Sequence, residues 1–197
     1  METVVVIGGG ASGMTAALTA AQSGRRIVVL ERQQRAARKL LATGNGRCNL
    51  TNTGARAENY HGENASFALP ALSRFTPQDT LDFFHALGLV TVTEYGGRGY
   101  PLSNSANSVV DVLRFALEQA GAELRCGVPA RSLSRAADGA GYVVGTDTGD
   151  ISADYVIVAC GGAAGAKLGG VMDGYELLKP LGHKRTRLYP ALVQLTT

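Results

Sequence analysis

Two short apolar runs frame an alanine-rich stretch at the start of the chain. Residues 4–7 are β-branched and apolar, as is typical of a buried parallel strand, and residues 27–30 form a second apolar run. Between them, residues 11–23 are apolar almost all round, which predicts a helix packed against a sheet. The pattern therefore predicts a β-strand, a helix and a second β-strand as one unit.

Two further helices are predicted in the middle of the chain. Thr76 provides an N-cap for a helix that Pro77 begins and that ends at Gly88. Residues 105–120 carry apolar side chains at helical spacing, and Gly121 ends the periodicity.

The second half of the chain predicts short strands separated by glycines. The extended pieces span residues 123–126, 130–134, 142–146 and 151–153. They indicate a β-meander rather than another unit of strand, helix and strand. An apolar run over residues 155–159 predicts a last strand that leads into Gly161 and Gly162. The expected fold is α/β, Rossmann-like, with a central parallel sheet, flanking helices and an inserted meander.

The turn after the first strand carries candidate chemistry. Gly8, Gly10 and Gly13 are spaced as in the dinucleotide-binding turn, where they permit a tight turn, a close pyrophosphate and close helix packing. The N–H groups of Ala11, Ser12 and Gly13 would begin the helix and bind the phosphates. Glu31 follows at the end of the second strand, where a carboxylate can accept the ribose hydroxyls. The alternative is a glycine-rich turn without a ligand.

Composition limits the class of protein. A chain of 197 residues with 45% hydrophobic content suits one domain with a sizeable core. No apolar run approaches a membrane span, and residues 1–3 lack a basic leader, so we expect a cytoplasmic protein without a membrane partner. The three cysteines form no CxxC pair, and no histidine has metal-ligand spacing. We therefore expect no disulfide framework and no metal.

The net charge of +3 is unevenly spread. Residues 25–47 contain seven basic side chains and a single acid, Glu31. This stretch could bind nucleic acid, or part of it could face a cofactor's pyrophosphate. Nucleic acid is the less favoured partner, because tryptophan is absent and aromatic residues make up 6% of the chain.

One block is more specific than the glycine turn. Residues 38–52, with the sequence RKLLATGNGRCNLTN, resemble the signature of the HI0933-like (BaiN/YhiN-type) flavoproteins. Residues 100–104, 154–162, 173–177, 181–183 and 190–193 match the same family. Residues 163–168 depart from the family's pattern, so no flavin contact is assigned there.

The resemblance implies an FAD-dependent oxidoreductase with NAD(P)H as a transient electron donor and a small-molecule substrate. It also implies cofactor contacts in addition to those of the glycine turn and Glu31. These are Arg32, Lys39, Gly44, Asn45, Gly46, Arg47, Cys48, Asn49, Ala130, Ala159, Gly161 and Gly162.

The resemblance also bears on domain organisation. Chains of this family are roughly twice as long, as expected of two to three domains. We therefore expect residues 1–187 to form an incomplete FAD-binding domain and residues 188–197 to begin the connection to an inserted domain. Such a portion alone would be inactive and would self-associate through its uncovered surface. The alternatives are a non-catalytic dinucleotide-binding module and an RNA-associated flavoprotein.

The side chains of the specific block allow two interpretations. Gly44 and Gly46 can form a tight turn around Asn45, and Arg47 offers a cationic fork for pyrophosphate or flavin. The same residues could instead form a self-capped structural loop. Cys48 fits a small buried side chain better than a nucleophile, because no histidine is near it in the sequence. No catalytic acid or base is assigned, as is common where the cofactor supplies the chemistry.

Overall fold

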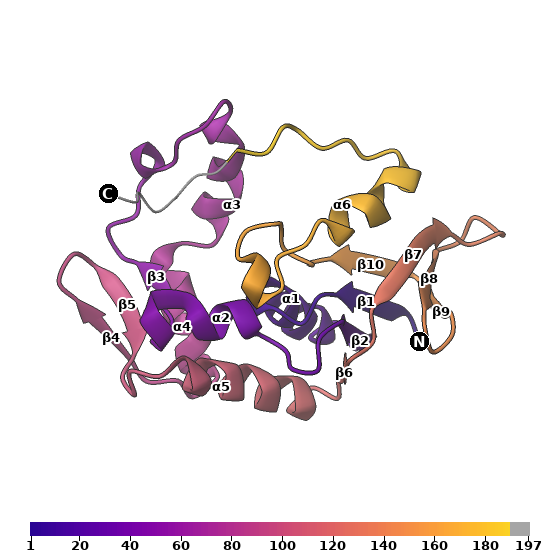
Figure 1. Ribbon diagram of the computed structural model, residues 1–197. Coiled ribbons are helices and arrows are strands. Elements are labelled where there is room, and N and C mark those ends of the chain that lie inside the picture. Colours follow the sequence, from indigo (N-terminus) through magenta and orange to yellow (C-terminus); the bar gives the residue numbers. More distant parts are fainter. Residues whose placement is uncertain (190–197) are drawn as a thin grey trace.

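The computed structural model describes residues 1–189 (Figure 1). Most of the expected connection, from residue 190 onward, lies outside the described residues. Within residues 1–189, no helix is both long and apolar enough to cross a membrane.

A four-stranded parallel sheet lies at the centre of the molecule. Its strand order is β10-β1-β2-β6, with every neighbouring pair parallel. The strands are β1 (Thr3–Ile7), β2 (Arg26–Glu31), β6 (Glu123–Cys126) and β10 (Tyr155–Val158). The Rossmann-like class expected from the sequence is therefore confirmed.

One part of the predicted topology is wrong. Residues 123–126 do not belong to the meander, because β6 pairs in parallel with β2, Val28 opposite Glu123. The helix α5 (Ala106–Gln119) returns the chain across the sheet, so the strand that follows it enters in parallel. The meander consists of β7 (Ala130–Arg135), β8 (Tyr142–Thr146) and β9 (Ile151–Ala153), which form their own antiparallel sheet.

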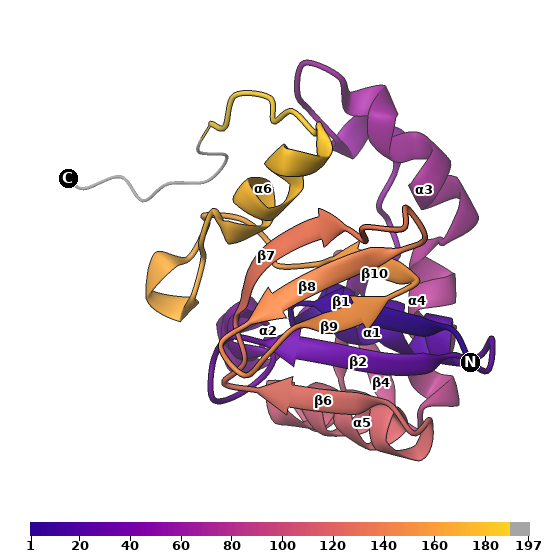
Figure 2. The same ribbon diagram turned by 90° about the vertical axis from the view of Figure 1, so that its right-hand side faces the viewer.

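The alternation of side chains along each strand divides the core in two. Val4 and Val6 contact α1 (Ala11–Ala21) and α5 on one face. Val5 and Ile7 face the opposite way, into a cluster with Leu133 of the meander. Figure 2 shows the resulting layers, with the meander crossing one face of the parallel sheet and the helices covering the other. This two-sided burial explains why residues 4–7 of β1 and 27–30 of β2 are apolar at every position.

A second antiparallel sheet extends the helical side of the molecule. It contains β3 (Thr51–Asn52), β5 (Arg98–Pro101) and β4 (Thr91–Glu94), in that order. The helix α4 (Pro77–Ala86) packs against it and begins with the predicted cap, in which the Thr76 hydroxyl accepts a hydrogen bond from the Asp79 N–H at 3.2 Å. Between β2 and this sheet the chain forms α2 (Arg38–Ala42) and the short 3-10 helix η1 (Thr43–Gly46).

The other elements lie around the open side of the sheet. They are η2 (Ala57–Asn59), η3 (Ala65–Ala68), α3 (Leu69–Arg74), η4 (Ala166–Leu168), α6 (Asp173–Leu178) and η5 (Lys179–Leu181). In the upper part of Figure 1, α3 and α6 are separated from each other.

Three backbone segments meet closely where β1 turns into α1. A Cβ on Gly13 would lie 1.8 Å from the Gly8 carbonyl oxygen, and a Cβ on Gly8 would lie 2.4 Å from the Ala159 oxygen. Gly8 also has a φ of +115°, which side chains rarely allow. The sequence-based roles of Gly8 in the tight turn and Gly13 in close packing are therefore seen in the structure.

We predict that Gly13→Ala lowers the free energy of unfolding by about 1–3 kcal/mol, because the new methyl group overlaps backbone. Gly10→Ala is the matched control, since a Cβ there meets no atom within 4 Å. The control should cost at most about 1 kcal/mol, through the poorer N-cap. Thermal unfolding of both variants checks this, and an equal loss at the two positions would contradict it.

Candidate functional site

A cavity of about 1000 Å³ opens at the carboxyl ends of the parallel strands. This edge is the usual ligand site of an open α/β sheet, and the volume suits a large ligand. The cavity brings together most of the residues singled out from the sequence. They are Gly8, Gly10, Ala11, Ser12, Glu31, Arg32, Lys39, Cys48, Asn49, Ala130, Ala159 and Gly161.

The glycine turn and the start of α1 form one wall. Gly10 is the N-cap of α1 and is extended, with a φ of −86° and a ψ of −174°. The space beyond its Cα is open to 4 Å, so a ligand can approach the backbone there. The first N–H groups of a helix have no acceptor within the helix and carry the positive end of its dipole. This wall therefore fits a pyrophosphate.

Glu31 is held at the end of β2 by two backbone donors. Its Oε2 accepts a hydrogen bond from the Gly9 N–H at 3.0 Å, and its Oε1 accepts one from the Gln33 N–H at 2.8 Å. The carboxylate thus lies beside the glycine turn at the cavity wall. A carboxylate in this position can still accept further hydrogen bonds, because each oxygen has more than one lone pair.

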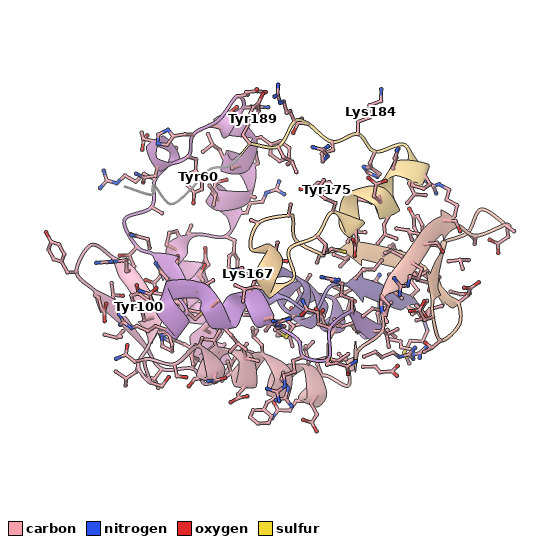
Figure 3. All side chains as sticks on the ribbon, viewed as in Figure 1. Tyr60, Tyr100, Lys167, Tyr175, Lys184 and Tyr189 are labelled. Atoms are coloured by element: carbon pink, nitrogen blue, oxygen red, sulfur yellow. The ribbon has the colours of Figure 1, made fainter. Side chains whose placement is uncertain are left out.

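The segment after β10 forms the opposite wall. It is connected to residues 32–39 by side chains that donate to its carbonyl groups. Lys39 Nζ lies 3.3 Å from the Gly162 oxygen, and an Arg32 nitrogen lies 3.4 Å from the Gly169 oxygen. Gln33 Nε2 similarly lies 3.4 Å from the Leu168 oxygen. Figure 3 shows Lys167 of this segment close to α2. The basic residues near β2 therefore shape the cavity and give it positive charge.

Residues 38–52, the block that resembles the family signature, turn sharply beside the cavity, and only some of them line it. Gly44, Asn45, Gly46 and Cys48 all have left-handed backbone, with φ values of 56°, 56°, 83° and 59°. Cys48 and Asn49 line the cavity, whereas Gly44, Asn45, Gly46 and Arg47 are not among its lining residues. The cofactor contacts predicted for those four stay untested.

Arg47 has partners away from the cavity. Its Nε donates to the Asn104 Oδ1 at 2.8 Å, its two terminal nitrogens bind the Glu94 carboxylate, and its guanidinium lies 4.0 Å from the centre of the Tyr100 ring. The hydrogen bond that Arg47 donates to the Glu94 carboxylate raises the pKa of Arg47 above its ordinary value. These contacts engage Arg47 within the protein, and its predicted cofactor contact stays a prediction.

Burial disfavours the thiolate form of the two cysteines near the site. Burial raises the pKa of the Cys48 thiol, and burial together with Asp173 raises the pKa of Cys160 to about 11. Cys160 Sγ donates to the Ile7 oxygen at 3.5 Å. Because the thiolate is the reactive form, neither residue is suited to nucleophilic chemistry. Cys48 is a small buried side chain and Cys160 is half-buried.

Two other predicted positions, Gly13 and Gly162, do not line the cavity and have contacts within the protein. Gly13 packs on Gly8, and Gly162 presents its carbonyl to Lys39. Sequence reasoning missed Gln33, Pro129, Leu168 and Gly169, which also line the cavity. The proximity of Gln33 to Glu31 could have indicated the first, but the others come from loops without a recognisable motif. Within residues 1–189, no cluster of three or more His, Cys, Asp or Glu side chains could hold a metal.

Comparison with known proteins supports an assignment to a family. The model of the HI0933-like protein Rossmann domain matches residues 2–188. The chain belongs to this family. It is therefore a Rossmann domain from a family of flavin-dependent oxidoreductases.

Two curated proteins illustrate the range of the relatives. The 3-dehydro-bile acid delta(4,6)-reductase of Clostridium scindens is 44% identical over 80% of this chain and 38% of that protein. The ribosomal RNA dihydrouridine synthase of Escherichia coli is 30% identical over 75% of this chain and 36% of that protein. The chain thus spans little more than a third of the relatives it matches.

A solved structure confirms the fold independently. The match to the open conformation of a flavocytochrome c3 fumarate reductase covers 93% of this chain and 41% of that chain, with a TM-score of 0.62. The sequence identity is 19%, so this likeness concerns the fold alone.

We predict that Glu31→Ala weakens ADP binding by about 1–3 kcal/mol, because charge-assisted hydrogen bonds to the ribose are lost. Calorimetry with ADP and 2′-deoxy-ADP separates the loss of the ribose contact from a general loosening of the glycine turn. The unaltered chain should prefer ADP, whereas Glu31→Ala should bind both nucleotides equally. A preference of the same size in both proteins would contradict the ribose contact.

Proposed function

We propose that this chain is the FAD-binding portion of a flavin-dependent reductase that passes hydride from NAD(P)H to an organic acceptor. The observation that supports this most directly is the cavity at the strand ends, where an uncovered Gly10 backbone, a helix N-terminus and Glu31 meet. These are the features that a dinucleotide requires. A cytoplasmic location fits the three free thiols of the described chain.

In this proposal, the residues of the chain bind and orient the cofactor. Ser12 and Gly13 N–H groups would bind the pyrophosphate, and Glu31 would accept hydrogen bonds from the adenosine ribose. Ala130, which lines the cavity at the start of β7, would contact adenine. Cys48 and Asn49 would line the part of the cavity that holds the ring system. The bound flavin would supply hydride transfer, and an acid or base for the acceptor is not assigned among these residues.

The relatives suggest the chemical class of the acceptor. The names of both curated relatives describe saturation of a carbon–carbon double bond, in a steroid acid and in uridine. In each compound the double bond is conjugated with a carbonyl group, which favours hydride addition at the far carbon. We therefore propose a conjugated carbonyl compound as acceptor. The higher identity to the bile acid reductase favours a free small molecule over a base in RNA.

A non-catalytic binding module is the main alternative, because the chain spans 38% of the bile acid reductase. The segments of the reductase that this chain does not match would correspond to parts that contribute the rest of the flavin-ring site. The uncovered surface would then favour self-association of the isolated portion.

We predict that ADP binds equally to this chain and to the longer protein containing it, because the adenosine half of the site is complete here. FAD should bind more weakly to this chain, where part of the isoalloxazine contacts is missing. Equilibrium titration of both ligands against both proteins provides the measurement. Equal FAD affinity in the two would mean that residues 1–197 already hold the whole ring site.

We also predict that the longer protein, loaded with FAD and reduced by NADH or NADPH without oxygen, is reoxidised by a steroid enone. A saturated ketone of the same skeleton is the control acceptor and should leave the flavin reduced. Flavin absorbance follows the reaction. Reoxidation by uridine in ribosomal RNA, but by no free enone, would favour the RNA substrate, and RNA binding should then fall steeply with salt. Reoxidation by neither acceptor would contradict the proposed acceptor class.

A further inference from the structure

The Arg47 side chain joins four separate parts of the molecule. It lies against Tyr100 of β5, pairs with Glu94 of β4 and donates to Asn104, which precedes α5. We call Arg47, Glu94, Tyr100 and Asn104 the Arg47 clamp. Tyr100 is 6% exposed, so its ring is a buried platform for the guanidinium. In Figure 3, Tyr100 lies on the β4–β5 side of α2, and Lys167 lies on the other side.

The loop that carries Arg47 encloses the same ring. A Cβ on Gly44 would lie 3.1 Å from Tyr100 Cε1 and 2.8 Å from the Asn49 nitrogen. The Cys48 N–H donates to the Thr43 oxygen at 3.0 Å, and the Leu50 N–H donates to the Gly99 oxygen at 2.8 Å. The loop is therefore attached to the β4–β5 hairpin by Leu50 on one side of Cys48 and by Arg47 on the other.

The attached loop has a backbone conformation that its residues do not favour on their own. Asn45 and Cys48 have positive φ angles, which side chains disfavour, so the loop needs outside contacts to keep this form. Cys48 and Asn49 are the parts of the loop that line the cavity. The clamp residues are not among those that line the cavity.

We propose that Arg47 is a positioning residue: through Glu94 and Tyr100 it holds Cys48 and Asn49 in place as a wall of the flavin-ring part of the cavity. It does not itself bind the cofactor. This inference rests on the proposed FAD site, and it replaces the direct contact that the sequence suggested for Arg47.

A double-mutant cycle on cofactor affinity tests the inference. Arg47→Gln, Glu94→Gln and the double variant should each weaken FAD binding by the same factor, roughly tenfold, because each releases the same loop. ADP affinity should stay within about twofold in all three, since Glu31 is held by Gly9 and Gln33 and not by the clamp. A large loss in Arg47→Gln with none in Glu94→Gln would overturn the proposal in favour of direct contact. Unchanged FAD affinity in all variants, or an equal loss of ADP, would also overturn it.

Alkylation of Cys48 provides a measurement without any ligand. Cys48 is 5% exposed, so it should react slowly with iodoacetamide in the unaltered chain and faster in Glu94→Gln. The exposed Cys126 serves as the internal reference. Glu123→Gln is the matched control, because Glu123 forms a two-point pair with Arg125 at 2.8 Å for both contacts, at the start of β6, away from the strand ends that face the cavity.

The two measurements separate this inference from the proposed function. If the unaltered chain binds neither FAD nor ADP, the proposed function fails, and the alkylation rates still decide whether the clamp holds the loop. Unchanged Cys48 reactivity in Glu94→Gln would overturn the clamp even if FAD binds.

Discussion

The fold depends on one contact between backbones, at the point where β1, α1 and β10 meet. Side chains are excluded there, since a Cβ on Gly13 would overlap the Gly8 oxygen and a Cβ on Gly8 would overlap the Ala159 oxygen. The Gly8 N–H also donates to the Leu30 oxygen of β2 at 2.7 Å. This contact fixes the start of α1 against the ends of three strands. The backbone at Gly10 is open because Gly8 and Gly13, before and after it in the sequence, let the helix lie so close to the sheet.

The two-sided burial of the sheet keeps this edge free for a ligand. Helices cover one face and the meander covers the other, so the strands bury apolar side chains on both sides (Figure 2). Burial of this kind is the main favourable contribution to folding. The polar groups at this edge lie on the last residue of β2, on α2 and on the loops around the strand ends. Glu31 and Lys39 are therefore available to shape a cavity, because the core does not depend on them.

The sequence predicted the local features well and the long-range contacts poorly. The apolar runs of the strands, the glycine turn and the cap at Thr76 depend on residues close together in the sequence, and the structure shows them all. The strand at residues 123–126 was assigned to the wrong sheet, because four residues do not specify whether their partner runs parallel or antiparallel. The ion pair of Arg47 with Glu94 was not predicted for a similar reason, whereas the cofactor contact predicted for Arg47 stays a prediction. Its partner Glu94 is 47 residues away, and no periodic pattern connects the two.

The two ends of the cavity are built on different principles. At the Glu31 end the groups that face the ligand are mostly backbone, held by glycines that no other residue replaces easily. At the Cys48 end, the wall depends on side-chain contacts between loops, such as those of Arg47 with the β4–β5 hairpin. Backbone recognition is insensitive to most substitutions, so it can be shared by relatives whose names describe a steroid acid and a ribosomal RNA. Side-chain contacts between loops can change by single substitutions. Differences between relatives in the ring half of the site are therefore expected to arise in the loops, while the dinucleotide half stays the same.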